Sequence, residues 1–249
     1  MRHNIIDSYP LITDKRTKLL LIGLVLVGCF FLFYFWVKRP AGIHKSINKL
    51  VIKGHNKLST REIVAVLGIQ PGVSFEQFDL SVLEKNMLLH PRVRDVKISR
   101  QFYDRLLISI TERNASFAVQ SGGHLYEIDE DLKIISTDDV RDSELCVLSG
   151  EFAIGSGHIA GSRIRDLTSF VKQAFEMYPA LKDRISEFHL ASDGEIYIFI
   201  YRPKRIKVLM GTTMDLTGIR KLYAALAFFE AEDKKSELLD LRGEDAVYH

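Results

Sequence analysis

A run of 19 uncharged residues, Leu19–Val37, constrains this chain more than any other feature of its sequence. At about 1.5 Å per residue, a helix of this length reaches about 28 Å, close to the thickness of the hydrocarbon core of a bilayer. Tyr34 and Trp36 lie near its C-terminal end, where amphipathic aromatic side chains anchor in a headgroup layer. We therefore predict a transmembrane helix over residues 19–37.

Two other interpretations of the run fit less well. A cleaved signal peptide has a shorter apolar stretch and a small-x-small cleavage site, whereas Lys38 and Arg39 follow this run directly. A helix buried in a soluble core carries polar positions along one stripe, and this run has no such stripe. Basic residues flank the run on both sides, so the positive-inside rule does not decide its orientation.

The rest of the chain has the composition of a globular protein. Residues 38–249 carry equal numbers of acidic and basic side chains, which gives no general attraction for nucleic acid or anionic lipid. The two cysteines are Cys29, inside the apolar run, and Cys146. We therefore expect no disulfide framework, and the roughly 200 remaining residues must be stabilised by one or two apolar cores.

Local signals in residues 47–115 predict a small α+β unit of the order β-α-α-β-β. A short strand ends at Gly54, and the Ser59–Glu62 pair forms a capping box that opens a helix. Gly68 stops this helix, and Asp79 caps the next one. Two alternating apolar runs, at 93–98 and 106–111, lie close enough together to form a hairpin, the first with one irregularity.

Residues 116–249 predict a mixed β domain with two or more helices. Apolar residues at helical spacing mark amphipathic helices at 164–175 and 216–229. Short strand candidates lie at 117–120, 125–128, 133–135, 145–148, 187–190, 195–201, 206–210 and 238–241. Because no further strand is predicted after the last of these, we expect it to form an open edge of the sheet.

No motif of the sequence predicts catalysis. The segment Gly155–His158 has the spacing of neither a phosphate-binding loop nor a nucleophile elbow, so we interpret it as a turn. The eight histidines lack metal-ligand spacing, and His189 alternates with apolar neighbours as a solvent-facing strand residue does. We therefore predict no enzyme activity, no cofactor, no metal and no small-molecule substrate.

Several motifs of the chain occur in the order and spacing of a known family. They are Val51-x-x-Gly54, Leu58-Ser59-x-x-Glu62-Ile63, Leu67-Gly68-Ile69, Ser74-x-x-x-Phe78-Asp79, His90-Pro91-Arg92-Val93-x-x-Val96-x-Ile98-x-Arg100, Leu106-x-Ile108-x-Ile110-x-Glu112-Arg113 and Asp240-Leu241-Arg242. With these motifs the chain resembles the FtsQ family of bacterial cell-division proteins, called DivIB in other bacteria, whose POTRA domain corresponds to residues 47–113. The chain departs from the family at Leu132, where a turn glycine is common, and at Ala115, Gly243 and the residue after Tyr103.

The resemblance implies a topology and a set of domains. Residues 1–18 would be a cytoplasmic tail and 19–37 the single span of the inner membrane. Residues 38–46 would be a linker, 47–115 a POTRA domain and 116–249 an FtsQ-like β domain, both in the periplasm. It also implies concentration of the protein at the division septum.

The resemblance further implies a non-catalytic scaffold of the divisome. Such a scaffold links early and late division proteins, binds the small coiled-coil proteins FtsB and FtsL, and through them acts on the septal peptidoglycan synthase. The implied partner-binding residues follow the last predicted strand and are Leu241, Arg242, Gly243, Glu244, Asp245, Ala246 and Val247. Added strands bind through backbone hydrogen bonds at an open edge.

Two alternatives stay open at this point. The Asp240–Arg242 segment could merely close the domain, with Arg242 solvated or paired with Asp240 or Glu244. The chain could also be a POTRA-bearing component of protein translocation or outer-membrane assembly. Proteins of that class usually carry several POTRA units and a cleaved signal, whereas this sequence predicts one unit and a retained anchor.

Overall fold

The computed structural model of the chain describes residues 15–37, 46–70, 72–102, 104–232 and 236–248, with the backbone only at 15–17 and 37. Helix α1 spans Lys15–Val37, and its window Lys18–Trp36 is long and apolar enough to cross a membrane. The helix begins four residues before the predicted span, because its hydrogen-bond ladder continues through the preceding basic residues. The predicted membrane boundary at residue 18 stays a prediction, and residues 1–14 and 38–45 lie outside the described part.

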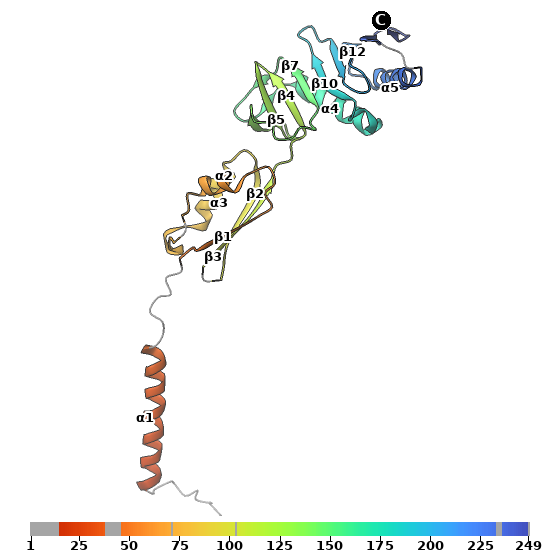
Figure 1. The fold of residues 1–249 in the computed structure, drawn as a ribbon. Helices are drawn as coiled ribbons and strands as arrows, with labels where there is room; N and C mark the ends of the chain where they lie inside the picture. Colours follow the sequence, from red (N-terminus) through yellow and green to blue (C-terminus); the bar gives the residue numbers. More distant parts are fainter. Residues whose placement is uncertain (1–14, 38–45, 71, 103, 233–235, 249) are drawn as a thin grey trace, which may run out of the picture.

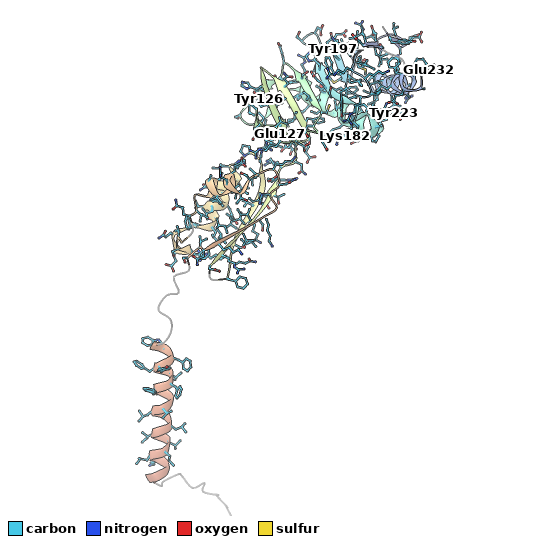
Figure 2. All side chains as sticks on the ribbon, viewed as in Figure 1. Tyr126, Glu127, Lys182, Tyr197, Tyr223 and Glu232 are labelled. Atoms are coloured by element: carbon cyan, nitrogen blue, oxygen red, sulfur yellow. The ribbon has the colours of Figure 1, made fainter. Side chains whose placement is uncertain are left out.

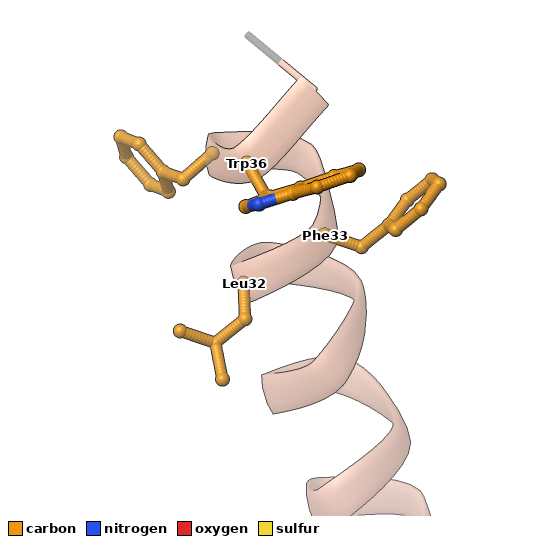
Figure 3. A pocket seen from close by; sticks show the side chains of 4 residues that line it. Leu32, Phe33 and Trp36 are labelled. Atoms are coloured by element: carbon orange, nitrogen blue, oxygen red, sulfur yellow. The ribbon is translucent and has the colours of Figure 1, made fainter. Parts of the chain in front are cut away.

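The side chains of α1 point outward without any protein packed against them. Leu32, Phe33, Phe35 and Trp36 project from its last turns and enclose an open hollow of about 460 Å³ (Figure 3). In a bilayer, acyl chains and headgroups fill such spaces between the side chains of a single helix. The hollow is thus consistent with a helix whose side chains face lipid.

The first globular unit has the predicted order β-α-α-β-β. Its three-stranded sheet has the order β1-β3-β2, with β1 parallel to β3 and β2 antiparallel to it. Two helices pack on one face of this sheet (Figure 1). The elements are β1 Lys49–Lys53, α2 Thr60–Leu67, the 3-10 helix η1 Phe75–Gln77, α3 Leu80–Leu88, β2 Val93–Gln101 and β3 Arg105–Glu112.

Local signals act in this unit as the sequence predicts. The Ser59 hydroxyl accepts the Glu62 N–H (3.2 Å), and the Glu62 carboxylate accepts the Ser59 N–H (2.8 Å). Gly68 ends α2 at a φ of 63°. Asp79 caps α3 by accepting the Ser81 N–H at 2.9 Å, and a bulge early in β2 accounts for the irregular alternation there.

Gly54 ends β1 in a conformation that only glycine adopts easily. Its φ is 80°, and a Cβ atom there would collide with the backbone carbonyl oxygen of Ile110 on β3. We expect Gly54→Ala to lower the free energy of unfolding by about 2–4 kcal/mol, from the positive φ and the overlap together. Urea unfolding of the chain measures this loss.

Gly68→Ala is the matched control for that measurement. Gly68 also has a positive φ, of 63°, but nothing lies within 4 Å of the added Cβ. The control is expected to lose only about 1 kcal/mol. Equal losses in the two variants would mean that the contact with β3 is unimportant.

The second unit is built on one nine-stranded sheet of the order β14-β13-β12-β11-β10-β7-β4-β5-β6. Its centre is parallel, with β7 between β4 and β10. The strands are β4 Phe117–Ser121, β5 His124–Ile128, β6 Ile134–Thr137, β7 Val147–Gly150, β10 Ile185–Leu190, β11 Ile196–Ile200, β12 Ile206–Gly211, β13 Leu238–Asp240 and β14 Val247–Tyr248.

Helices α4, Ser162–Met177, and α5, Leu216–Ala231, share one core with this sheet. Their buried faces pack against the inward side chains of the strands, such as Phe188 and Ile198. Both helices lie on the same face of the sheet, and the opposite face carries no helix among the described residues (Figure 1). The 3-10 helix η2, Pro179–Leu181, follows α4. A small hairpin of β8, Ala153–Ile154, and β9, Ile159–Ala160, encloses the segment predicted as a turn.

Charged side chains join the two units. Arg92 and Glu127 form an ion pair at 2.5 Å, and both are buried, at 4% and 0% exposed. Arg141 pairs with the Glu62 carboxylate at 2.6 Å and donates to the Lys57 carbonyl oxygen at 2.6 Å. We call these five residues the ionic joint; Figure 2 labels Glu127 at the end of the large sheet that faces the first unit.

The ionic joint ties a helix cap to the second unit. Glu62 completes the capping box of α2 and also accepts the guanidinium of Arg141. The hydrogen bonds from Arg141, and then those from Ser59, hold the pKa of the Glu62 carboxyl well below its usual range. The joint went unpredicted, because its members lie far apart in the sequence.

Candidate partner-binding edge

Residues 238–241, predicted to form the open edge of the large sheet, do not form that edge in the structure. Strand β14 pairs antiparallel with β13, in the register Leu239 to Tyr248 and Asp240 to Val247. Strand β13 is therefore an inner strand, and the prediction that it forms the edge is wrong. Among the described residues β14 is the last strand on this side, because the chain reverses after β13 and returns beside it.

The implied partner-binding residues occupy this reversal. Leu241 is buried at 4% exposed, and its N–H donates to the Leu209 carbonyl oxygen of β12 at 2.9 Å. The residues 242–247 are all exposed. Lys221 of α5 donates to the Gly243 carbonyl oxygen at 2.7 Å and so holds the loop against the helix. Leu241 thus anchors the segment, while the residues after it are accessible to a partner.

Arg242 is already paired within the chain. Its guanidinium lies 2.6 Å from Asp240 Oδ2 and 4.0 Å from Glu195 Oε1. If the Asp240–Arg242 segment only closes the domain, Arg242 is expected to be either solvated or paired with a neighbouring carboxylate, and the pairing with Asp240 is the second of these arrangements. The side chain is nevertheless 47% exposed, so a partner carboxylate can reach it by exchange with Asp240.

Aromatic side chains support β14 from the helix side. The ring of Tyr248 lies 5.4 Å from Phe229 and 6.4 Å from Phe228 of α5, centroid to centroid. Tyr248 and Phe228 are 44% and 45% exposed. Tyr223 of the same helix, labelled in Figure 2, stacks on Tyr178, the residue that follows α4. An added strand would thus meet apolar surface as well as backbone.

Sequence reasoning missed these aromatic residues. The predicted set ended at Val247 and left out Tyr248 and the exposed Phe228. One signal was available, because Phe228 and Phe229 are adjacent on an amphipathic helix and cannot both face the core. A two-residue strand is too short for alternation to reveal it.

At the opposite end of the large sheet, the outer strand β6 is contacted at its start by a neighbouring segment. Strand β6 is flanked by the β8–β9 segment, where Ile134 donates its N–H to the Gly157 carbonyl oxygen at 2.9 Å. Lys133 and His158 form an isolated bridge beside it. The outer strands of the large sheet, in the part that the structure describes, are therefore β6, which is contacted at its start, and β14, which pairs with β13. Either outer side can accept a further strand, and β14 is the one that follows the implied partner-binding residues.

Ser149, Glu187 and His189 form a polar cluster on the face of the sheet without helices. The Ser149 hydroxyl lies 2.6 Å from His189 Nδ1 and also contacts the Glu187 carboxylate. A catalytic relay needs the carboxylate on the far nitrogen of the imidazole, whereas here both groups contact the same hydroxyl. His189 stacks on Tyr197, so the cluster links adjacent strands.

No described residues gather into a set of three or more His, Cys, Asp or Glu side chains suited to a metal ion. Cys146 is buried, and burial, followed by the charge of Glu187, raises the pKa of its thiol to about 12. A thiol with so high a pKa is protonated at neutral pH and reacts slowly.

Comparison with known proteins finds similarity to bacterial cell-division proteins. A family model described as "POTRA domain, FtsQ-type" matches residues 45–113. The cell division protein FtsQ of Zymomonas mobilis is 26% identical over 251 residues, which cover 94% of this chain and 71% of that protein.

Two further relatives match over shorter segments. The FtsQ of Novosphingobium aromaticivorans is 28% identical over 144 residues, 57% of this chain and 41% of that protein. The FtsQ of Myxococcus fulvus is 26% identical over 145 residues, 57% of this chain and 51% of that protein. The chain thus matches about half of the length of these two relatives.

Proposed function

We propose that this chain, which belongs to the FtsQ family of cell-division proteins, is a non-catalytic scaffold that binds its division partners through the open edge at β14. The family gives it a role in cell division, and helix α1 is consistent with a single-pass membrane protein. The finer proposal is that it holds FtsB and FtsL and through them helps to control septal peptidoglycan synthesis.

The open edge carries this proposal. The exposed residues 242–247 lead into β14, whose outer side meets no other described strand. An edge strand presents unpaired N–H and C=O groups to which a partner strand can add. The aromatic surface of Phe228 and Tyr248 lies beside it and can bury apolar side chains of the added strand.

We also propose a division of labour between the two units. Residues 47–115 form the POTRA domain, which meets one set of division proteins, and 116–249 form the β domain, which carries the edge. The ionic joint supports this bridging role, since it links the two units through the buried pair of Arg92 and Glu127. A firm joint would let a partner on one unit bias the position of the other.

Co-purification of the full chain tests the proposal. The chain solubilised in detergent is expected to retain FtsB and FtsL together. Recovery of outer-membrane assembly proteins instead, with FtsB and FtsL absent, would contradict the scaffold function and favour a translocation component. A chain lacking residues 242–248 is the control, and it is expected to lose both division partners.

Orientation in the membrane is a separate prediction. Basic residues flank the apolar run 19–37 on both sides, so the family resemblance and not the charge carries the expectation of a cytoplasmic N-terminus. A reporter enzyme that is active only in the periplasm is expected to be active when fused after His249. It is expected to be inactive when fused before Met1, and the reverse pattern would invert the proposed topology.

A further inference from the structure

The β2–β3 hairpin of the POTRA unit ends in an exposed aromatic side chain. Phe102 follows the last residue of β2 and is 76% exposed. Its φ is 57°, in the left-handed region, where a bulky side chain is uncommon and glycine or asparagine is favoured. A large apolar side chain thus lies at the tip of a turn with most of its surface in contact with solvent.

The tip lies at the end of the unit where the chain arrives from α1. The Asp104 carbonyl oxygen accepts the N–H groups of Asn48, at 2.9 Å, and Lys49, at 3.1 Å. These residues open the unit, and Figure 1 shows the hairpin at the end where β1 begins. The eight residues of β3 carry the chain about 25 Å away from the tip, toward the large sheet.

The connection to α1 is short. The eight residues 38–45 separate the helix from Ser46, and even a fully extended chain of this length reaches only about 30 Å. A tether of this kind turns contact with the membrane into an intramolecular event at high effective concentration. Even a weak preference of the tip for the bilayer surface is then sufficient to hold it there.

The charges around the tip favour an anionic surface. Lys49 and Arg105 are neighbours in the pairing of β1 with β3, and the Arg105 guanidinium lies 5.4 Å from the centroid of the Phe102 ring. Arg100, near the end of β2, is also exposed, and its guanidinium donates to the Phe75 carbonyl oxygen at 3.0 Å. Asp104 lies 3.7 Å from Arg105 and offsets one of these charges. The net charge of these four side chains is positive, as is typical of segments that lie against anionic headgroups.

We propose that the β2–β3 tip is a membrane-docking site, which inserts Phe102 at the boundary between headgroups and acyl chains of the same bilayer that α1 spans. Lys49 and Arg105 then lie at the level of the lipid phosphates. Aromatic side chains favour this interfacial layer. The docking sets the height and tilt of the POTRA unit above the membrane. It requires only that α1 spans the bilayer, and it is independent of the division partners.

Tryptophan fluorescence of the full chain tests this site. Trp36 is the only tryptophan, so Trp36→Phe removes the background signal. Phe102→Trp then reports on the tip. Leu89→Trp is the matched control, because Leu89 is 81% exposed but lies just before β2, whose first residue pairs with Glu112 at the far end of the unit. Both proteins are reconstituted in phosphatidylcholine–phosphatidylglycerol vesicles that contain brominated acyl chains.

Bromine quenches only tryptophans at the bilayer. We expect quenching at position 102 to exceed that at position 89 by about threefold or more, and to weaken in phosphatidylcholine alone or when Lys49 and Arg105 are both replaced by glutamate. Equal quenching at the two positions, or none at 102, would overturn the proposal. Gln101→Trp, also exposed at the tip, repeats the measurement if Phe102→Trp does not keep a normal thermal unfolding transition.

Discussion

Replacing Glu127 by leucine is expected to lower the free energy of unfolding by about 3–5 kcal/mol, because it removes the carboxylate paired with the buried Arg92 guanidinium. Arg92 is then left with its contacts to Asp139, at 2.7 Å to the carbonyl oxygen and 3.8 Å to the carboxylate. Arg92 is 4% exposed and its guanidinium lies 2.5 Å from Glu127. Glu127 also accepts the N–H groups of Arg141, at 2.8 Å, and Asp142, at 3.2 Å. Urea unfolding of the chain in detergent measures the loss.

Two further variants separate the causes of this loss. Glu230→Leu removes the partner of Arg184 in a more exposed pair, of 3.0 Å, and is expected to cost less than about 1 kcal/mol. Arg92→Met combined with Glu127→Leu removes both buried charges and is expected to recover much of the stability. If the double variant is as unstable as Glu127→Leu alone, the uncompensated charge is not the cause.

Replacing Ala246 by proline is expected to weaken binding of the FtsB–FtsL pair by about tenfold or more, while the melting temperature stays near that of the unmodified chain. Ala246 is exposed and directly precedes β14. Proline there removes one backbone donor and hinders pairing of a partner strand. An exposed edge contributes little to the core, so thermal unfolding should change little.

Arg242→Glu tests the side-chain contribution at the same edge. The change would repel an acidic partner contact, at a cost of about 2–5 kcal/mol if the charge pair is desolvated. Because Arg242 is paired with Asp240 in the structure, the change also introduces repulsion within the chain. Asp240→Asn combined with Arg242→Gln is the matched control, since it removes both charges without that repulsion.

Calorimetry and a binding titration of the same variants decide between the two interpretations of this edge. Unchanged binding by both Ala246→Pro and Arg242→Glu would remove the edge from the mechanism. Weaker binding together with a large fall in melting temperature would support a segment that only closes the domain. Weaker binding with normal unfolding is the result that the proposed function requires.

Leu132 illustrates how the structure keeps a local conformation despite a change of residue. The family commonly has a turn glycine there, and Leu132 adopts a φ of 61°. The Asp129 carboxylate accepts the N–H groups of Asp131 and Lys133, each at 3.0 Å. Leu132 itself is buried at 8% exposed. Hydrogen bonds and burial on either side thus hold a conformation that leucine alone disfavours.

The sequence by itself determined the long apolar helix α1 and the order β-α-α-β-β. These features depend on neighbouring residues: an unbroken apolar run for α1, the Ser59–Glu62 capping box and Gly68 for α2, and alternation for the β2–β3 hairpin. Each signal acts over a few residues, because a cap or a turn satisfies backbone groups that lie next to it in the chain.

Only the tertiary structure decided which strand forms the edge, which charges are buried and which aromatic side chains are exposed. Strand β14 covers β13 because the chain reverses between them. Arg92 meets Glu127, and Arg141 meets Glu62, across segments far apart in the sequence. Such contacts form when packing brings distant segments together and water is excluded, and the free energy of that burial is set by the whole fold and not by any local pattern.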